Sequence, residues 1–134
     1  MTVEAEDRIL IIDAGTGIRP LGRQLLGTDK TIYLVLTHVH SDHVEGFPFF
    51  KPLFEEERTI HIVDHHYEDT SWSLLERFDG LHFPLEPAQI PATIHRVRDD
   101  GIAYLNDNGF DLSRRPINHP GGAYGYRISL NGQT

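Results

Sequence analysis

The sequence predicts an α/β fold, and two observations lead to this prediction. Short runs of branched apolar residues, typical of buried strands, alternate with polar and glycine-containing connections. Polar clusters follow directly after several of these runs, which is where open α/β sheets place their ligand sites. The length of 134 residues corresponds to one domain that can bury a core of its own.

The first third of the chain predicts strand, helix and strand. ILIIDAG (9–15) is expected to form a buried strand, because consecutive branched apolar residues end at an acid and a glycine. A short helix is expected within 15–27, with Pro20 in its first turn, its leucines on one face and Gly27 as its C-terminal stop. TIYLVL (31–36) predicts a second buried strand.

The middle of the chain predicts two further strands and an amphipathic helix. The aromatic segment GFPFF (46–50) can start a short helix, and TIHIV (59–63) alternates like a strand. YEDTSWSLLERF (67–78) has Trp72, Leu75 and Phe78 at helical spacing, so we expect a helix there. ATIHRV (92–97), after a proline-rich stretch, predicts a strand.

The last third predicts a hairpin and one more strand. Residues 101–117 are expected to form the hairpin, with Asn108-Gly109 in its turn. NHPGG (118–122) predicts a loop and AYGYRISL (123–130) a strand. NGQT (131–134) then opens with another hairpin-turn signal.

The densest chemical signal is HVHSDH (38–43), which comes directly after the strand predicted at 31–36. A loop leaving a strand end lets His38 and His40 converge on one cation, while Asp42 and His43 turn toward a second. Imidazole and carboxylate ligands suit zinc and also manganese or iron. Two ions about 3.5–4 Å apart would convert a bridging water to hydroxide near neutral pH. A solvated polar turn is the simpler alternative, but four potential ligands at a strand end favour a metal site.

Three stretches resemble the metallo-β-lactamase-fold hydrolases, in the branch with ribonuclease-Z-like and cyclic-phosphate phosphodiesterase-like members. They are ILIIDAGTGIRPLG (9–22), TIYLVLTHVHSDHVEGFPFF (31–50) and PINHPGGAYGYRI (116–128). The resemblance implies an αββα sandwich, of which the chain would hold the first half and the start of the second, with a mixed sheet and flanking helices. Residues 1–134 would then form a single, incomplete domain of this fold.

The resemblance also implies metal ligands by position. His38, His40 and His119 match the ligands of a first ion, and Asp42 and His43 match ligands of a second. Asp42 is in addition the candidate catalytic residue, which would orient or deprotonate the attacking water.

One further acid and two glycines have implied roles behind this site. Asp13 of DAGTG matches a buried acid that orients a ligand histidine or the motif loop, although a strand-end acid capping the next turn is an equal alternative. Gly121 and Gly122 are expected to permit a tight loop. The family's bridging aspartate and final histidine would lie beyond Thr134, so the second metal site is expected to be incomplete.

The expected activity is therefore that of a phosphodiesterase, which attacks a small or cyclic phosphoester with metal-bound hydroxide. Two divalent cations, zinc before manganese or iron, are the expected cofactors. Hydrolysis of a thioester or lactam by the same fold is an alternative within enzymes. A catalytically incomplete half-domain that binds metal and acts as a binding module is the alternative from another class.

Composition limits the partners. The net charge of −8 disfavours a broad grip on nucleic acid, while a bound dication could still attract a small anionic phosphoester. No apolar stretch approaches the ~18 residues that span a membrane, and no secretory signal begins the chain, so a cytoplasmic location is expected. Cysteine is absent, which leaves His, Asp and Glu as metal ligands. An unpaired sheet edge makes a homodimer possible.

Two other groups leave a functional and a structural interpretation open. Asp64 and His66 could bind adventitious metal, but a polar turn is the preferred interpretation. The phenylalanines of 47–54 could line the mouth of a pocket, although core packing is favoured and different rings can do each.

Overall fold

A five-stranded mixed sheet forms the centre of the computed structural model, which describes residues 1–67 and 70–129, with the backbone alone for 65–67 and 70–72. Its strands, in spatial order, are β1 (Thr2–Glu4), β2 (Arg8–Ile12), β3 (Thr31–Val35), β4 (Thr59–Val63) and β7 (Thr93–Val97). β1 is antiparallel to β2, and the other neighbours are parallel. The predicted α/β class, the mixed sheet and the strands at β2, β3, β4 and β7 are confirmed, and β1 is an additional strand.

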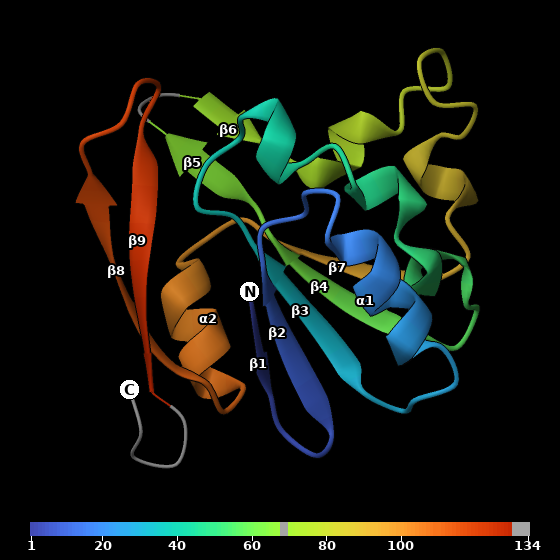
Figure 1. Ribbon diagram of the computed structural model, residues 1–134, viewed down its shortest axis with the longest axis horizontal. Coiled ribbons are helices and arrows are strands. Elements are labelled where there is room, and N and C mark those ends of the chain that lie inside the picture. Colours follow the sequence, from blue (N-terminus) through green and yellow to red (C-terminus); the bar gives the residue numbers. More distant parts are fainter. Residues whose placement is uncertain (68–69, 130–134) are drawn as a thin grey trace.

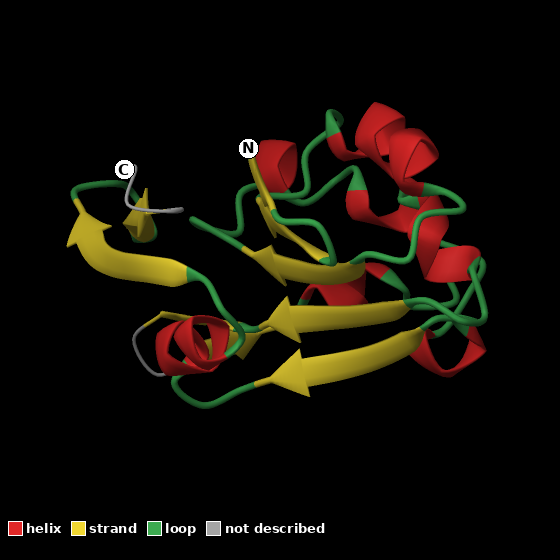
Figure 2. Cartoon of the chain, turned by 90° about the horizontal axis from the view of Figure 1, so that it is seen from below, coloured by secondary structure: helices red, strands yellow, loops and turns green. Residues whose placement is uncertain are grey.

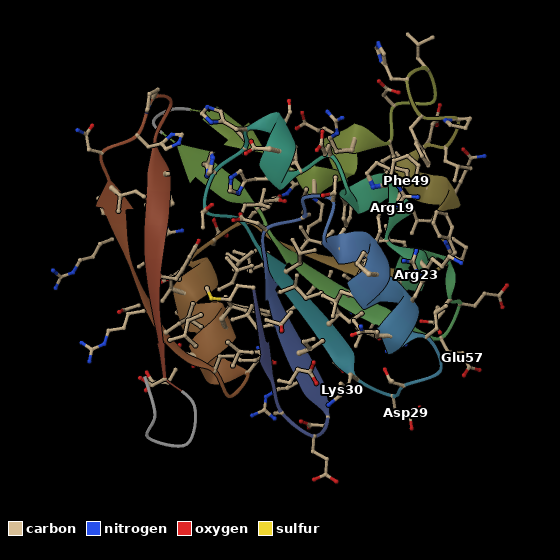
Figure 3. The ribbon with its side chains drawn as sticks, in the orientation of Figure 1. Arg19, Arg23, Asp29, Lys30, Phe49 and Glu57 are labelled. Atoms are coloured by element: carbon tan, nitrogen blue, oxygen red, sulfur yellow. The ribbon has the colours of Figure 1, made fainter. Side chains whose placement is uncertain are left out.

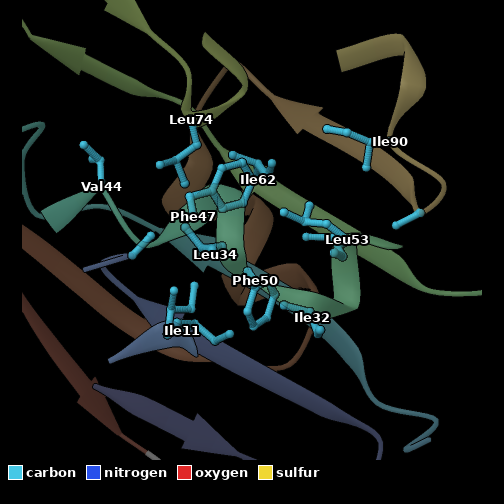
Figure 4. Close-up of a cluster of buried hydrophobic side chains, with 14 of the residues drawn as sticks. Ile11, Ile32, Leu34, Val44, Phe47, Phe50, Leu53, Ile62, Leu74 and Ile90 are labelled. Atoms are coloured by element: carbon cyan, nitrogen blue, oxygen red, sulfur yellow. The ribbon is translucent and has the colours of Figure 1, made fainter. Parts of the chain in front are cut away.

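The middle of the sheet is buried on both faces because β2 and β3 are apolar at successive positions. In β2, Ile9 and Ile11 enter one core while Leu10 and Ile12 enter the other. The first core lies beneath the helices of the amino-terminal half, and its central side chains include Phe47 (Figure 4). Parallel strands covered on both faces have all their carboxyl ends at one edge, beside the β8–β9 hairpin in Figure 2.

Short helices cover the first core (Figure 1). They are α1 (Ile18–Leu25) and the 3₁₀ helices η2 (Phe47–Phe49), η3 (Lys51–Phe54), η4 (Leu74–Arg77) and η5 (Pro87–Gln89). One more 3₁₀ helix, η1 (Ser41–His43), has no buried residue. Gly27 has φ of +74° just beyond α1, which confirms it as the helix stop. The aromatic segment starts a short helix as predicted, with Phe50 buried and Phe49 exposed.

The helix predicted over 67–78 is wrong. The backbone instead forms β5 (His65–Tyr67) and β6 (Thr70–Trp72), paired antiparallel, before η4. Ser73 explains the change, because its hydroxyl accepts the Leu75 amide while Glu76 reaches back to the Ser73 amide. This capping box starts a new helix in the middle of the predicted one. The side chains of His66 and Trp72 lie outside the described residues.

The predicted hairpin over 101–117 is wrong in its first half. Residues Gly101–Asp107 form a helix, α2, capped by the Asp100 carboxylate, which accepts the Ala103 amide. Leu105 of this helix is fully buried in the second core. Packing therefore favours a helix, although the strand propensity of this apolar run favours an extended backbone. Gly109, at φ of +86°, ends this helix instead of turning a hairpin.

The actual hairpin pairs β8 (Asp111–Ile117) with β9 (Ala123–Ser129). These strands confirm the predictions for 111–117 and for 123–129, joined by the predicted loop at 118–122. NGQT lies outside the described residues. Among the residues that are described, no helix is long and apolar enough to cross a membrane.

A stacked row of rings links the sheet to α2. His61 stacks between Tyr33 at 4.4 Å and His95 at 4.8 Å, and the Tyr104 hydroxyl lies 2.6 Å from its Nδ1. Burial, and then the neighbouring His95, lowers the pKa of His61 to about 4. The row therefore keeps His61 neutral, with Nδ1 free to accept the tyrosine proton.

This lowered pKa predicts a loss of stability in mild acid. Between the unfolded pKa of 6.5 and the folded pKa of about 4, the unfolded chain binds the extra proton, so the free energy of unfolding falls as pH falls. We expect His61→Gln to remove about 1–2 kcal/mol of that fall, a value reduced for partial exposure. Urea denaturation at pH 7 and pH 4.5 measures it. Equal pH dependence in the variant and the wild type would contradict the prediction.

Candidate metal centre

The predicted site residues lie where the central parallel strands end. The chain turns at Asp13, just after β2, and at His38, just after β3. The Asp13 amide donates to the Val35 carbonyl at 2.9 Å, so pairing of β2 and β3 continues into the turn. Asp13 has φ of +67°, a conformation that aspartate adopts more readily than most residues. The sheet register thus fixes Asp13 next to the histidine motif.

Three histidines converge at this edge. The ligand atoms of His38, His40 and His119 all lie within 4.8 Å of one another. His38 is buried, His119 is half-buried and His40 is exposed. Nitrogens bound to one zinc ion at about 2.0–2.1 Å can be at most about 4 Å apart, so side-chain shifts of roughly 1 Å would close the group on a cation.

A second group of possible ligands shares His38 with the first. Atoms of His38, Asp42 and His43 also lie within 4.8 Å of one another, and the His38 and His43 rings are 3.9 Å apart. Asp42 and His43 both belong to η1, and His43 Nε2 lies 3.4 Å from a carboxylate oxygen of Asp42. The structure therefore brings all five predicted ligands together around His38.

Asp13 orients two of these histidines. One carboxylate oxygen lies 2.9 Å from His43 Nδ1, and the carboxylate also accepts the Thr37 amide and hydroxyl at 2.8–3.0 Å. The Thr37 hydroxyl lies in turn 2.9 Å from His38 Nδ1. With the Thr37 proton directed to Asp13, both imidazoles donate from Nδ1 and keep the Nε2 lone pair for a cation.

The 118–122 loop holds His119 in the same tautomer. His119 Nδ1 lies 2.9 Å from the Pro120 carbonyl, to which its proton can be donated. Gly121 and Gly122 both have φ of +79°, so their glycine character permits the tight turn as predicted. The Tyr124 amide donates to the Thr37 carbonyl at 2.8 Å, which fastens the start of β9 to the end of β3.

Tyr126 provides a second attachment between β9 and the motif strand. Its hydroxyl donates to the Leu36 carbonyl at 2.8 Å. Burial raises the pKa of Tyr126 to about 12, so the hydroxyl keeps its proton and remains a donor at neutral pH. These contacts explain how a histidine so distant in sequence meets the motif.

The donor set fits a divalent cation. Once His43 donates Nδ1 to Asp13, its Nε2 is an acceptor, yet it lies 3.4 Å from a carboxylate oxygen of Asp42. Two acceptors facing each other need a proton or a metal ion between them. Burial, followed by the neighbouring His43 and His119, lowers the pKa of His38, which favours the neutral ring that binds metal.

Two glycines that sequence reasoning did not single out hold the motif loop against the turn after β2. A Cβ on Gly15 would lie 2.3 Å from the Asp42 carbonyl oxygen, and one on Gly46 would lie 2.1 Å from the Gly15 carbonyl oxygen. The Gly46 amide also donates to the Ala14 carbonyl at 2.9 Å. Thr37 was likewise missed, although its place between strand and motif was the available signal.

A cavity of about 520 Å³ adjoins the second group of ligands. Its polar lining comes from the metal-centre loops and includes Asp13, Asp42 and His43, and its apolar lining includes Ile18 and Leu21 from α1. This volume lies within the range of small-molecule sites.

The fold and site together define an α/β protein with a cluster of histidine and aspartate side chains, of a kind that could hold metal ions, at the carboxyl edge of its sheet. The chain belongs to the metallo-beta-lactamase superfamily, because the model of that family matches residues 1–134. Membership implies a metal-dependent hydrolase, typically with two metal ions. No curated protein and no solved structure matches the chain significantly.

Replacing Asp13 by asparagine tests its orienting role. Asparagine tolerates the same backbone conformation but has only one acceptor oxygen, so it cannot accept both the Thr37 amide, which meets one carboxylate oxygen, and His43 Nδ1, which meets the other. We expect zinc affinity to fall by about 10–100-fold, the usual effect of losing a partner behind a ligand. Competition with a chromophoric chelator measures it, and Asp111→Asn, an exposed change on β8, is the control. Unchanged affinity in Asp13→Asn would contradict the prediction.

Proposed function

We propose that the chain is a metal-dependent phosphodiesterase acting on a small or cyclic phosphoester. The observation that carries this proposal is the convergence of five predicted ligands on one edge of the sheet, with His38 common to both groups. The phosphoester preference rests on the resemblance of the DAGTG, THVHSDH and NHPGG segments to the branch that includes phosphodiesterase-like members.

The proposed division of roles follows the two groups. His38, His40 and His119 would hold the first divalent cation, and Asp42 with His43 would contribute to the second. When bound, such ions polarise the phosphoryl group and lower the pKa of water. Zinc is the first choice and manganese or iron the alternatives, because all ligands are imidazole or carboxylate.

Asp42 is proposed as the catalytic residue of this chain. Its carboxylate is exposed at the mouth of the site, unlike the buried His38, so it can meet a water from solvent. A carboxylate beside the reacting centre can orient that water and accept its proton. Asp13 stays behind the ligands and holds His43 through Nδ1, so its proposed role is positioning.

The adjoining cavity supports a small substrate. Its volume of about 520 Å³ suits a compact ester, and its apolar side could take an organic substituent. A polyanionic nucleic acid suits this chain less well, because the net charge is −8.

Hydrolysis of bis(p-nitrophenyl) phosphate by the purified, zinc-loaded chain tests the proposal. We expect chelator-sensitive release of p-nitrophenol that His40→Ala abolishes, whereas His82→Ala, an exposed histidine away from the cluster, retains it. Hydrolysis of a thioester or lactam substrate without activity on the phosphodiester would overturn the substrate class. Zinc binding without any hydrolysis would instead favour the metal-binding module.

A further inference from the structure

A cluster of cations lies on the outer side of α1, separate from the metal centre. Arg19 and Arg23 are four residues apart on the helix, so they share a face, and Lys51 extends from η3 beside it. Among the side chains that the structure describes, none forms an ion pair with these three. A chain with net charge −8 thus concentrates unpaired positive charge at one place.

Exposed aromatic rings stand among these cations. Phe49 is 50% exposed and Phe54 is 41% exposed, and the Arg19 guanidinium lies 5.0 Å from the Phe49 ring centre. Figure 3 shows the Arg19 and Phe49 side chains close to each other, with Arg23 farther along α1. Together with Pro48 and Phe83, these residues line a hollow of about 330 Å³.

The hollow is built on packed elements. A Cβ on Gly22 would lie 2.9 Å from the Phe50 ring and 3.2 Å from the Lys51 amide nitrogen, so α1 crosses η3 at close range. Phe49 meets Phe83 edge to face at 5.8 Å, and Phe83 meets the buried Phe78 at 5.1 Å. The walls are therefore held in place without a ligand.

We propose that this hollow binds a small amphipathic anion, with one carboxylate, phosphate or sulfonate group attached to an apolar body. The body would pack on Phe49 and Phe54 while the anionic group meets Arg19 and Arg23. A guanidinium stacked on a ring keeps its N–H edge free for such a group. The small volume and the net charge of −8 both favour a compact anion over a polyanion.

An NMR titration of the full chain with decanoate, in the presence of a chelator, tests this proposal independently of metal and catalysis. Decanoate combines one carboxylate with an apolar chain, decanol lacks the charge, and acetate lacks the chain. We expect decanoate to shift backbone amides in 19–23 and 49–54, with saturation, and the other two ligands to bind at least about tenfold more weakly. Equal binding of decanol or acetate would overturn the proposal.

Variants and a membrane control complete the test. Arg19→Gln/Arg23→Gln should weaken decanoate binding by about tenfold or more, while Arg115→Gln, an exposed change on β8, leaves it unchanged. All these side chains are exposed, and the amide spectrum itself reports whether each variant is folded. Shifts confined to 37–43 and 118–122 would assign the carboxylate to the metal centre and overturn the proposal. The proposal would also be overturned if the chain sedimented with phosphatidylserine-containing vesicles but showed no saturable decanoate binding. The cluster would then be a membrane contact.

Discussion

Substitution of His38 by alanine is expected to lower zinc binding more than the loss of any other ligand. His38 alone belongs to both groups of possible ligands, and its ring lies 3.9 Å from that of His43 and 4.5 Å from that of His119. Its removal would leave each group with two side chains. We therefore expect zinc to bind weakly in this variant, whichever group the single free nitrogen of His38 serves, and kcat/KM for a phosphodiester to fall about a thousandfold or more.

Comparison with single-group variants makes this prediction specific. His40→Ala affects only the first group and Asp42→Asn only the second, so each should retain more zinc than His38→Ala when measured by plasma emission after dialysis. His95→Ala removes a surface-facing histidine of the stacked row and controls for general loss of histidine. Zinc retention in His38→Ala equal to that in His40→Ala would show that the two groups do not depend on a common ligand.

The cluster of candidate metal ligands was predictable because most of its residues are close in sequence. HVHSDH comes just after an apolar strand. The end of that strand and the spacing of the possible ligands together identify four site residues. His119 came only from the resemblance, since its approach depends on the attachment of β9 to the end of β3 through the Tyr124 amide. A sequence pattern can identify residues that one loop brings together, whereas contacts between distant segments can be identified only from the folded structure.

The two wrong elements have a common physical origin. The run after Asp100 is apolar and short, so its periodicity does not separate strand from helix. Capping by Asp100 and burial of Leu105 favour the helix. Around Ser73, helical spacing indicated one long helix, but the capping box with Glu76 starts a new element there. In both cases a local capping contact fixes where a helix begins, and burial of Leu105 adds to it in the first case.

Thr37 shows why residues behind the ligands are harder to predict. A threonine between a strand and a loop has many ordinary explanations, and only the folded distances identify its contacts. Its hydroxyl lies within 3.0 Å of both Asp13 oxygens and of His38 Nδ1, so it connects a carboxylate to a ligand on another strand. The same reasoning applies to Gly15 and Gly46, because only the folded structure shows that the turn after β2 and the motif loop approach too closely there for a side chain.

Gly46→Ala is expected to destabilise the fold and to displace the histidine motif. The added methyl group would lie 2.1 Å from the Gly15 carbonyl oxygen and 2.9 Å from a methyl carbon of Ile18. The nearer atom belongs to the backbone of a turn that also accepts the Gly46 amide through Ala14, so it cannot move away without breaking that hydrogen bond. Overpacking of this kind costs about 1–3 kcal/mol, and backbone contact places this case at the upper end.

Gly17→Ala, in the facing turn after β2, provides the matched control. A Cβ at Gly17 would meet nothing within 4 Å, and its φ of −63° is allowed for any residue. Alanine there should be neutral or stabilise by about 0.4–1 kcal/mol through the unfolded state. Urea denaturation compares the two variants, and zinc affinity shows whether the motif moves. If Gly46→Ala were as stable as Gly17→Ala, the prediction would be wrong. The motif loop and the turn at Gly15 could then move apart at little cost in free energy.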